Sequence, residues 1–329
     1  MKPKLILVEG VAGSGKSTTS QWLNLTLGRS FPTAWYPEDG EPGGLRCYYD
    51  AERQTATEYG QTLVSRWADF LAESFLEEGT WIAESALLQS PIHGLLLRDV
   101  DATTIEGVVG RLFQVLSSIE PCLIYLRPSD PGEAIRRACG SRYEGLLEEY
   151  IRRIESSPFG IRHGLSGFEG LAEFWSKLAR ICDELVDHFE GKKVVVRMSG
   201  DDRESSRSAI LNFLSDNGFA LPSISDFVPP ITDLSRYAGT YTRKIGDRTA
   251  KVEVRIVDGE LTIFGLAPYL WDAGERLIAK APGIFAAASW PTDVHFQERD
   301  DGVTSFHLAT ILGGRKTDEV FPRATIANI

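Results

Sequence analysis

The first 220 residues alternate between short apolar runs and longer segments whose apolar residues recur at helical spacing. The apolar runs lie at 4–8, 33–36, 81–84, 121–126 and 192–198. The helical patterns between them are clearest at 17–27, 51–78, 144–156 and 168–189, and glycines stop two of them. Apolar runs that alternate in this way with helices predict an α/β fold, a parallel five-stranded sheet with helices on both faces.

The pattern changes after residue 220. Residues 221–235 are rich in Pro and Ser and are typical of a linker. Beyond them, apolar and polar residues alternate at 250–257, 261–264, 292–298 and 304–309, with Asp-Gly turns at 258–259 and 301–302. We therefore predict a first domain at 1–222, a linker at 223–236 and an antiparallel all-β accessory domain at 237–329.

A glycine-rich loop follows the first apolar run. Residues 10–17 read GVAGSGKS, which satisfies the pattern G-x-x-x-x-G-K-[ST] between a predicted strand and a predicted helix. In such a loop the backbone N–H groups and the helix N-terminus bind phosphate oxygens, the lysine binds the β and γ phosphates, and the last hydroxyl binds Mg²⁺. The alternative is a Gly/Ser-rich turn without a ligand, which explains neither the lysine nor the spacing. The predicted ATP-binding residues are Gly10, Gly13, Ser14, Gly15, Lys16, Ser17 and Thr18.

Acidic residues follow the next two predicted strands. Glu38, Asp39 and Glu41 come after 33–36, where the ligand crevice of an open α/β sheet lies, so they are candidates to face an acceptor. Their alternative interpretation is a solvated acidic loop. Glu84 ends the third strand and is the candidate acid on the metal, together with Ser17. Its alternative is a helix N-terminal carboxylate without a metal.

Two further helices begin with capping signals. Thr103 and Glu106 have the spacing of a capping box, which predicts a helix from there to about residue 118. A second helix is predicted from Asp130, and it carries Arg136 with Arg142 just beyond. These arginines are either a solvated helix face or part of a lid that closes on a transferring phosphoryl group, and the upstream glycine loop favours the lid.

With these features, the first 220 residues resemble the phosphate-loop kinases of nucleosides and nucleotides, the deoxynucleoside kinase and thymidylate kinase group. The similarity lies in the glycine loop, in EPGG at 41–44, in Glu84-Ser85, and in Tyr125-Leu126 with the arginines after them. The chain departs from the group where an arginine is expected after Glu84 and where Gly140 replaces a lid arginine.

The resemblance implies an ATP- and Mg²⁺-dependent kinase of a small, nucleoside- or nucleotide-like acceptor. The implied catalytic residues are Lys16, Glu41, Glu84, Arg136 and Arg142, with Glu41 as the base and Glu84 on the metal. The candidate acceptor-binding residues are Tyr36, Glu38, Glu41 and Arg46. The β domain resembles the small lipocalin-like barrel appended to some penicillin-binding-protein-like hydrolases, through Tyr237-x-Gly239-x-Tyr241 and its turns.

The composition and net charge limit the classes of partner that the protein is expected to bind. The net charge of −11 argues against a protein that binds the backbone of a nucleic acid polymer. No apolar run approaches the ~18 residues of a membrane span. The four cysteines are scattered without a C-x-x-C pair, which favours a reducing cytoplasm over a zinc site or disulfides. We expect a small-molecule acceptor, no membrane partner and a possible homodimer.

Two other activities are alternatives to the kinase. One is a nucleotide-hydrolysing switch or motor, but a GTPase would carry N-K-x-D and D-x-x-G, and a motor would carry an apolar strand ending in Asp-Glu. The strand at 121–126 ends instead in Arg127. The other is a kinase of a non-nucleoside metabolite or antibiotic, which the sequence leaves open.

Overall fold

The structure is a computed structural model that describes residues 4–28, 33–38, 45, 54–73, 79–142, 145–198, 203–221, 233–245, 248–266, 274–290, 292–299, 302–312 and 315–324. Within these ranges the side chains of a few residues, Arg142 among them, are not described. The chain forms two compact units. Residues 1–139 and 144–222 make up the first, and residues 223–329 belong to the second.

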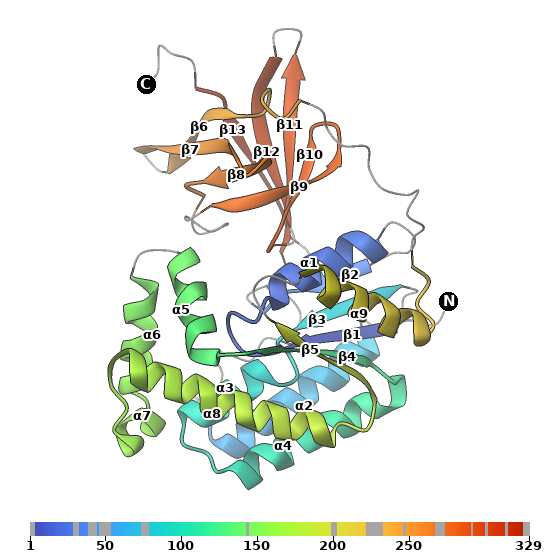
Figure 1. The fold of residues 1–329 in the computed structure, drawn as a ribbon, viewed down its shortest axis with the longest axis vertical. Helices are drawn as coiled ribbons and strands as arrows, with labels where there is room; N and C mark the ends of the chain where they lie inside the picture. The colour runs from blue at the N-terminus through green and yellow to red at the C-terminus, as the bar shows by residue number, and fades with distance from the viewer. Residues whose placement is uncertain are drawn as a thin grey trace. The chain divides into compact units, whose positions relative to one another are not determined.

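A parallel five-stranded sheet organises the first unit (Figure 1). Its strands run in the order β2-β3-β1-β4-β5. In this order β1 is the central strand, with Val8 opposite Glu84 of β3 and Glu9 opposite Tyr125 of β4. The strands are β1 (Lys4–Glu9), β2 (Thr33–Tyr36), β3 (Thr80–Glu84), β4 (Cys122–Pro128) and β5 (Lys192–Met198). Because all the strands are parallel, their carboxyl ends meet at one edge, where the polar residues Glu9 and Glu84 stand.

Helices cover both faces of this sheet (Figure 1). Alternate residues of β1 point to opposite faces. Leu5 and Leu7 pack in one core with α2, α4 and α8, whereas Ile6 and Val8 pack in another with α1 and α9. The helices are α1 (Lys16–Leu27), α2 (Ala56–Glu73), α3 (Gln89–Leu97), α4 (Ala102–Leu116), α5 (Pro131–Arg142), α6 (Leu146–Glu155), α7 (Pro158–His163), α8 (Gly167–His188) and α9 (Arg203–Asp216), with a short 3₁₀ turn, η2 (Ser117–Ile119). The predicted α/β class is confirmed.

The start of α4 differs from the sequence prediction. Asp101, not Thr103, is the N-cap, because its carboxylate accepts hydrogen bonds from both the backbone N–H (2.9 Å) and the hydroxyl (2.8 Å) of Thr104. The capping box at 103–106 was therefore wrong by two residues. The predicted helix start at Asp130 is correct, because its carboxylate accepts a hydrogen bond from the N–H of Glu133 at 3.0 Å in the first turn of α5.

The second unit is an antiparallel eight-stranded sheet that curls into a nearly closed barrel. Its strands follow one another in sequence order, each paired with the next. They are β6 (Gly239–Ile245), β7 (Arg248–Val257), β8 (Glu260–Phe264), β9 (Glu275–Ala281), β10 (Ile284–Ala287), β11 (Thr292–Arg299), β12 (Gly302–Leu312) and β13 (Arg315–Pro322). The antiparallel β prediction is confirmed. The lipocalin-like resemblance and the linker stay predictions, and residues 222–232 lie outside the described chain.

Aromatic side chains fill the barrel. Tyr237, Tyr241, Phe285 and Phe306 are all under 2% exposed, and Phe306 stacks on Phe321 with ring centroids 4.6 Å apart. Barrels of this size leave an interior just wide enough for side chains. The observed aromatic core accordingly makes this a packed barrel.

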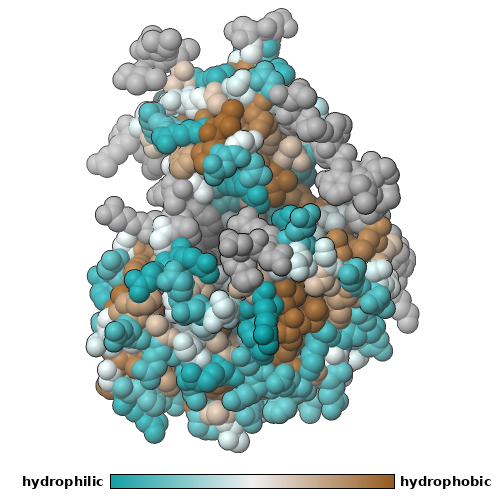
Figure 2. Space-filling model, viewed as in Figure 1, coloured by the Kyte–Doolittle hydropathy of each residue, from teal (hydrophilic) through white to brown (hydrophobic). Residues whose placement is uncertain are grey.

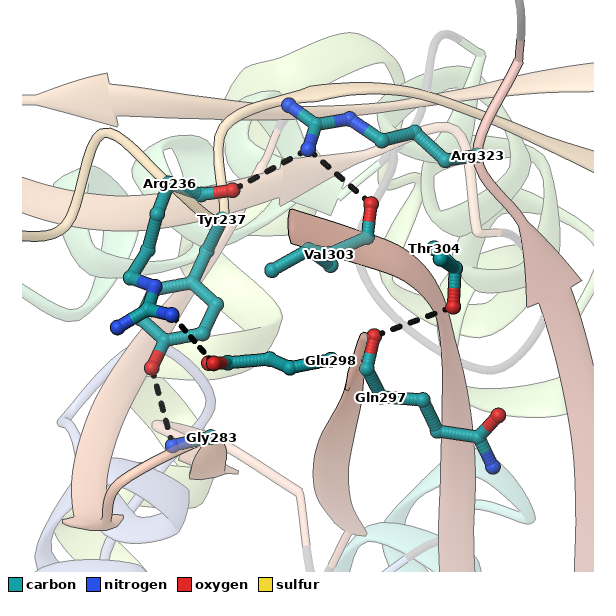
Figure 3. A network of polar contacts seen from close by, with 8 residues as sticks. All are labelled: Arg236, Tyr237, Gly283, Gln297, Glu298, Val303, Thr304 and Arg323. Carbon is teal, nitrogen blue, oxygen red and sulfur yellow. Dashed lines mark hydrogen bonds and ion pairs between the residues drawn. The ribbon is translucent and has the colours of Figure 1, made fainter. Parts of the chain in front are cut away.

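The side chain of Arg323 adds to the backbone contacts between the two ends of the barrel sheet, where Tyr241 pairs with Arg323 and the N–H of Ala324 donates to the carbonyl oxygen of Thr240 at 2.9 Å. The guanidinium of Arg323, just after β13, donates to the carbonyl oxygens of Arg236 (3.3 Å), Ala238 (2.6 Å) and Val303 (3.2 Å). Figure 3 shows two of these bonds beside the hydroxyl of Tyr237, which accepts the N–H of Gly283 at 3.1 Å. We call the contacts of Arg323 the barrel seam. These hydrogen bonds tie the segment before β6 and the strand β12 to the residue that follows β13.

Hydrophilic side chains predominate among the described residues on one face of the molecule (Figure 2). In Figure 2, hydrophilic residues cover much of the visible face and hydrophobic ones gather in a few patches. Large apolar side chains exposed among the described residues include Ile161, Ile256 and Val320. Within the same residues, no helix is both long and apolar enough to cross a membrane.

Candidate active site

The glycine loop joins β1 to α1 and takes backbone conformations that favour glycine. Gly13 has a φ of +78° and Gly15 a φ of +91°. A Cβ atom on Gly13 would lie 2.1 Å from the carbonyl oxygen of Ala134 in α5, and one on Gly10 would lie 2.4 Å from that of Leu126. The loop therefore passes so close to the end of β4 and to α5 that a side chain is excluded at both Gly10 and Gly13.

Two polar side chains of the loop are buried. Ser14 is 2% exposed, and its Oγ has no hydrogen-bond partner within the described part of the chain. Lys16 is 5% exposed, and its Nζ donates to Gln89 Oε1 (2.7 Å) and to the carbonyl oxygen of Val11 (3.1 Å). A buried polar atom without a partner costs about 1–3 kcal/mol. A phosphate oxygen next to Ser14 and Lys16 would remove that cost.

A hydroxyl and a carboxylate meet beside the loop. Ser17, in the first turn of α1, donates to Glu84 Oε1 at 2.6 Å, and the indole Nε1 of Trp35 donates to Glu84 Oε2 at 3.1 Å. Glu84 is 3% exposed at the end of β3. The next residue, Ser85, has a φ of +58°, an uncommon left-handed conformation for a residue with a side chain. This turn directs the chain from β3 toward α3 immediately after Glu84.

A second carboxylate, Glu38, lies at the end of β2. It accepts hydrogen bonds from Gln89 Nε2 (2.5 Å), Ser85 Oγ (3.0 Å) and Ser90 Oγ (3.3 Å). Because Gln89 also accepts from Lys16, the amide of Gln89 bridges the loop lysine and Glu38. Sequence reasoning did not identify Gln89, since a neutral amide within an apolar run belongs to no motif.

A third carboxylate, Glu9, was also missed. It is fully buried at the end of β1 and accepts the backbone N–H groups of Leu87 (2.7 Å) and Gln89 (3.1 Å). Burial raises the pKa of Glu9 to about 7, although these N–H groups and the nearby Lys16 favour its charged form. The sequence does carry a signal for this residue, because Glu9 is the last residue of an apolar strand, as Glu84 is. Glu9 holds the start of α3, and hence Gln89, against the glycine loop.

The remaining predicted site residues are placed as follows. The ring of Tyr36 stacks on Trp81 (centroids 5.6 Å apart) and meets Phe70 edge-on at 5.4 Å. Thr18 is half-buried in the first turn of α1. Glu41 and Arg46 lie outside the described residues, and Arg142 belongs to α5 without a described side chain. Their proposed roles stay predictions.

Arg136 of α5 is turned to the surface. Its side chain is 54% exposed, lies 3.5 Å from Glu133 and covers the ring of Phe168 at 3.6 Å. Arg127, at the end of β4, donates to Asp183 Oδ1 at 2.9 Å. In this structure neither guanidinium contacts Lys16, Glu38 or Glu84.

The described chemistry is therefore that of an anion site next to an acidic one. The glycine loop, Ser14 and Lys16 offer donors and a positive charge, which suits a phosphate group. Ser17 and Glu84 offer hard oxygen ligands. Among the described residues, no group of three or more His, Cys, Asp or Glu side chains could hold a metal ion by itself.

Two solved structures resemble the chain. A deoxyadenosine kinase from M. mycoides with bound dATP aligns over 64% of this chain and 99% of its own, with 21% identity and a TM-score of 0.39. A thymidylate kinase from Ehrlichia chaffeensis aligns over 66% of this chain and 100% of its own, with 10% identity and a TM-score of 0.39. No protein-family model and no curated protein sequence matches the chain.

Proposed function

We propose that this protein is a phosphotransferase that moves the γ-phosphoryl group of ATP, with Mg²⁺, to a small acceptor that is nucleoside- or nucleotide-like. The observation that carries the proposal is the cluster at the carboxyl ends of β1, β2 and β3. There the amide of Gln89 accepts a hydrogen bond from Lys16 at 2.7 Å and donates one to Glu38 at 2.5 Å. Beside them, Ser17 donates to Glu84 at 2.6 Å. Binding ATP with Mg²⁺ requires Lys16, Ser17 and Glu84, whereas a second carboxylate, Glu38, is useful for accepting a proton from an acceptor.

The donor half would bind the phosphates. The N–H groups of the loop and of the first turn of α1 point at an anion held there, and Ser14 Oγ gains a partner. Lys16 would exchange its contact with Gln89 for the β and γ phosphates and stabilise the charge that develops during transfer.

The residues present fit a magnesium ion. Mg²⁺ is usually bound by one or two carboxylates together with substrate phosphates, and Ser17 and Glu84 supply a hydroxyl and a buried carboxylate side by side. When bound, the ion would neutralise charge on the phosphate oxygens. Trp35 would keep Glu84 oriented through its bond to Oε2.

Glu38 is the described carboxylate that suits the acceptor base. Three donors hold it next to the donor half, so it can take a proton from an attacking hydroxyl without moving far. Glu41 remains the second candidate for this role. Arg136 would join by leaving Glu133 and Phe168, which are exposed contacts worth about 1 kcal/mol or less each.

ADP release from Mg-ATP tests the proposal. The protein is incubated with nucleosides, nucleotides and other hydroxylated metabolites, and the Lys16→Met variant serves as the control. We expect acceptor-dependent ADP release that falls about 10²–10³-fold in the variant, while circular dichroism shows an intact fold. Unchanged turnover in a folded Lys16→Met protein would exclude the assignment.

A further inference from the structure

Two histidines lie side by side on the outer surface of the barrel. His295 of β11 and His307 of β12 are directly opposite each other in the antiparallel ladder. Their sequence neighbours Val294, Phe296 and Phe306 belong to the core of the barrel, so the two imidazole rings point outward. Both residues are half-buried, and the ring centres are 4.7 Å apart with a tilt of 36° between the ring planes. The ladder therefore holds two nitrogen-bearing rings next to each other.

The separation of the two rings is one that two imidazoles have when both bind the same metal ion. A ring nitrogen lies about 1.1 Å from the centre of its ring and about 2.0–2.1 Å from a bound zinc ion. Two imidazoles at a right angle or a tetrahedral angle around one ion therefore have their centres about 4.5–5.1 Å apart. The 4.7 Å between His295 and His307 falls within this range. Because the ladder positions both side chains before an ion binds, little ordering is needed on binding.

The side chains around the histidine pair determine the class of ion that it suits. Across the ladder, the same row continues with the aliphatic residues Ile284 on β10 and Val320 on β13. Asp293, two residues before the histidine of β11, is ion-paired with Lys280 at 2.6 Å. Among the described residues, no cluster of three or more His, Cys, Asp or Glu side chains forms here. The protein ligands are then two imidazoles, which suit zinc, copper and nickel, whereas Mg²⁺ and Ca²⁺ prefer oxygen ligands.

We propose that His295 and His307 form a binding site for a divalent transition-metal ion such as Zn²⁺, with water molecules in the remaining coordination positions. The site differs from the magnesium site proposed beside Ser17 and Glu84, because it belongs to the second unit and offers nitrogen ligands. A bound ion joins β11 to β12. Since an ion that binds the folded state in preference to the unfolded chain stabilises the fold, the site stabilises the barrel.

Calorimetric titration of the full chain with Zn²⁺, in the presence of excess Mg²⁺, tests the site. Excess Mg²⁺ competes for oxygen ligands but not for imidazoles. We expect one Zn²⁺ to bind per chain. His295→Gln and His307→Gln should each weaken binding by at least roughly 10-fold, because losing even an outer partner of a metal ligand costs about 10–100-fold. His188→Gln, which changes an exposed histidine at the end of α8, is the control and should leave the affinity unchanged.

The electron paramagnetic resonance spectrum of bound Cu²⁺ provides a second measurement, which needs only the wild-type protein if a variant fails to fold. The unpaired electron should couple to two imidazole nitrogens in the wild type and to one in a folded His295→Gln or His307→Gln protein. Three results would each overturn the inference: no binding of Zn²⁺ to the wild type, coupling of Cu²⁺ to fewer than two nitrogens there, or equal Zn²⁺ affinity in the wild type and in a folded variant of either histidine.

Discussion

Replacing Gly13 by alanine tests the geometry of the glycine loop without reference to any substrate. The φ of +78° at Gly13 costs a residue with a side chain about 1–2 kcal/mol. The added methyl group would also lie 2.1 Å from the carbonyl oxygen of Ala134, so the loop and α5 must separate by more than 1 Å to reach an ordinary contact of 3.4 Å or longer. Overpacking of this kind costs about 1–3 kcal/mol. We expect Gly13→Ala to lower the free energy of unfolding by roughly 2–5 kcal/mol, the sum of these two costs.

Two other glycines provide matched controls. Gly15→Ala adds the same methyl group at a φ of +91°, but its nearest neighbour is the Met198 methyl carbon at 3.5 Å, so only the backbone cost of about 1–2 kcal/mol applies. Gly107→Ala lies inside α4 with nothing within 4 Å of the new Cβ, and it should stabilise the protein by about 0.5–1 kcal/mol.

Urea unfolding followed by tryptophan fluorescence, with calorimetric titration of ATP, measures the series. We expect the free energy of unfolding to decrease in the order Gly107→Ala, wild type, Gly15→Ala, Gly13→Ala. Gly13→Ala should also lose at least 10-fold in ATP affinity. A Gly13→Ala protein as stable as the wild type would show that the loop does not pass Ala134 as described.

Three further predictions concern other parts of the molecule. Gln89→Met should lower kcat at least 10-fold while changing the KM for ATP less, because it removes the shortest of the three hydrogen bonds that hold Glu38 and its link to Lys16; an equal loss in both would indicate a general packing defect. Burial raises the pKa of Glu9, and of Glu275 in the barrel strand β9, to about 7, above the 4.5 of the unfolded chain. The folded protein therefore binds these protons more tightly than the unfolded chain does. The stability that this protonation supplies is fully present below pH 4.5 and is lost as the pH rises through 7. The free energy of unfolding by urea should be lower at pH 8 than at pH 5.5, by up to roughly 2 kcal/mol per group, and an increase would contradict the reasoning. Arg323→Ala should destabilise the barrel by about 2–4 kcal/mol in thermal unfolding, and Arg323→Lys should restore only part of this.

Sequence reasoning predicted the placement of those residues whose position in the fold depends on local order. The loop at 10–17 and Glu84 could be predicted because a strand, a turn and a helix in succession fix where their side chains lie. Gln89 could not be, because its two contacts join the loop lysine to the end of β2, and no local pattern encodes that meeting.

Orientation and boundaries were harder to predict. The direction of Arg136 depends on the rotation of α5 and on Phe168, which lies 32 residues further along the chain. Asp101 and Thr103 are both good caps, and only the geometry of the turn decides between them. Four barrel strands, β6, β9, β10 and β13, were not predicted from the sequence; in β10 the alanines at 286 and 287 interrupt the alternation of apolar and polar residues.

The barrel seam has a consequence for the order in which the chain acquires structure during synthesis. Arg236 and Arg323 are 87 residues apart, and the sheet cannot be joined at its ends until the later one has left the ribosome. Until then β6 has an edge without a partner, which is a template for pairing with another chain. The parallel sheet, whose strands all precede residue 199, has no such delay. A ribosome that stalls or terminates shortly before codon 323 should therefore release an aggregation-prone polypeptide whose first unit is already folded.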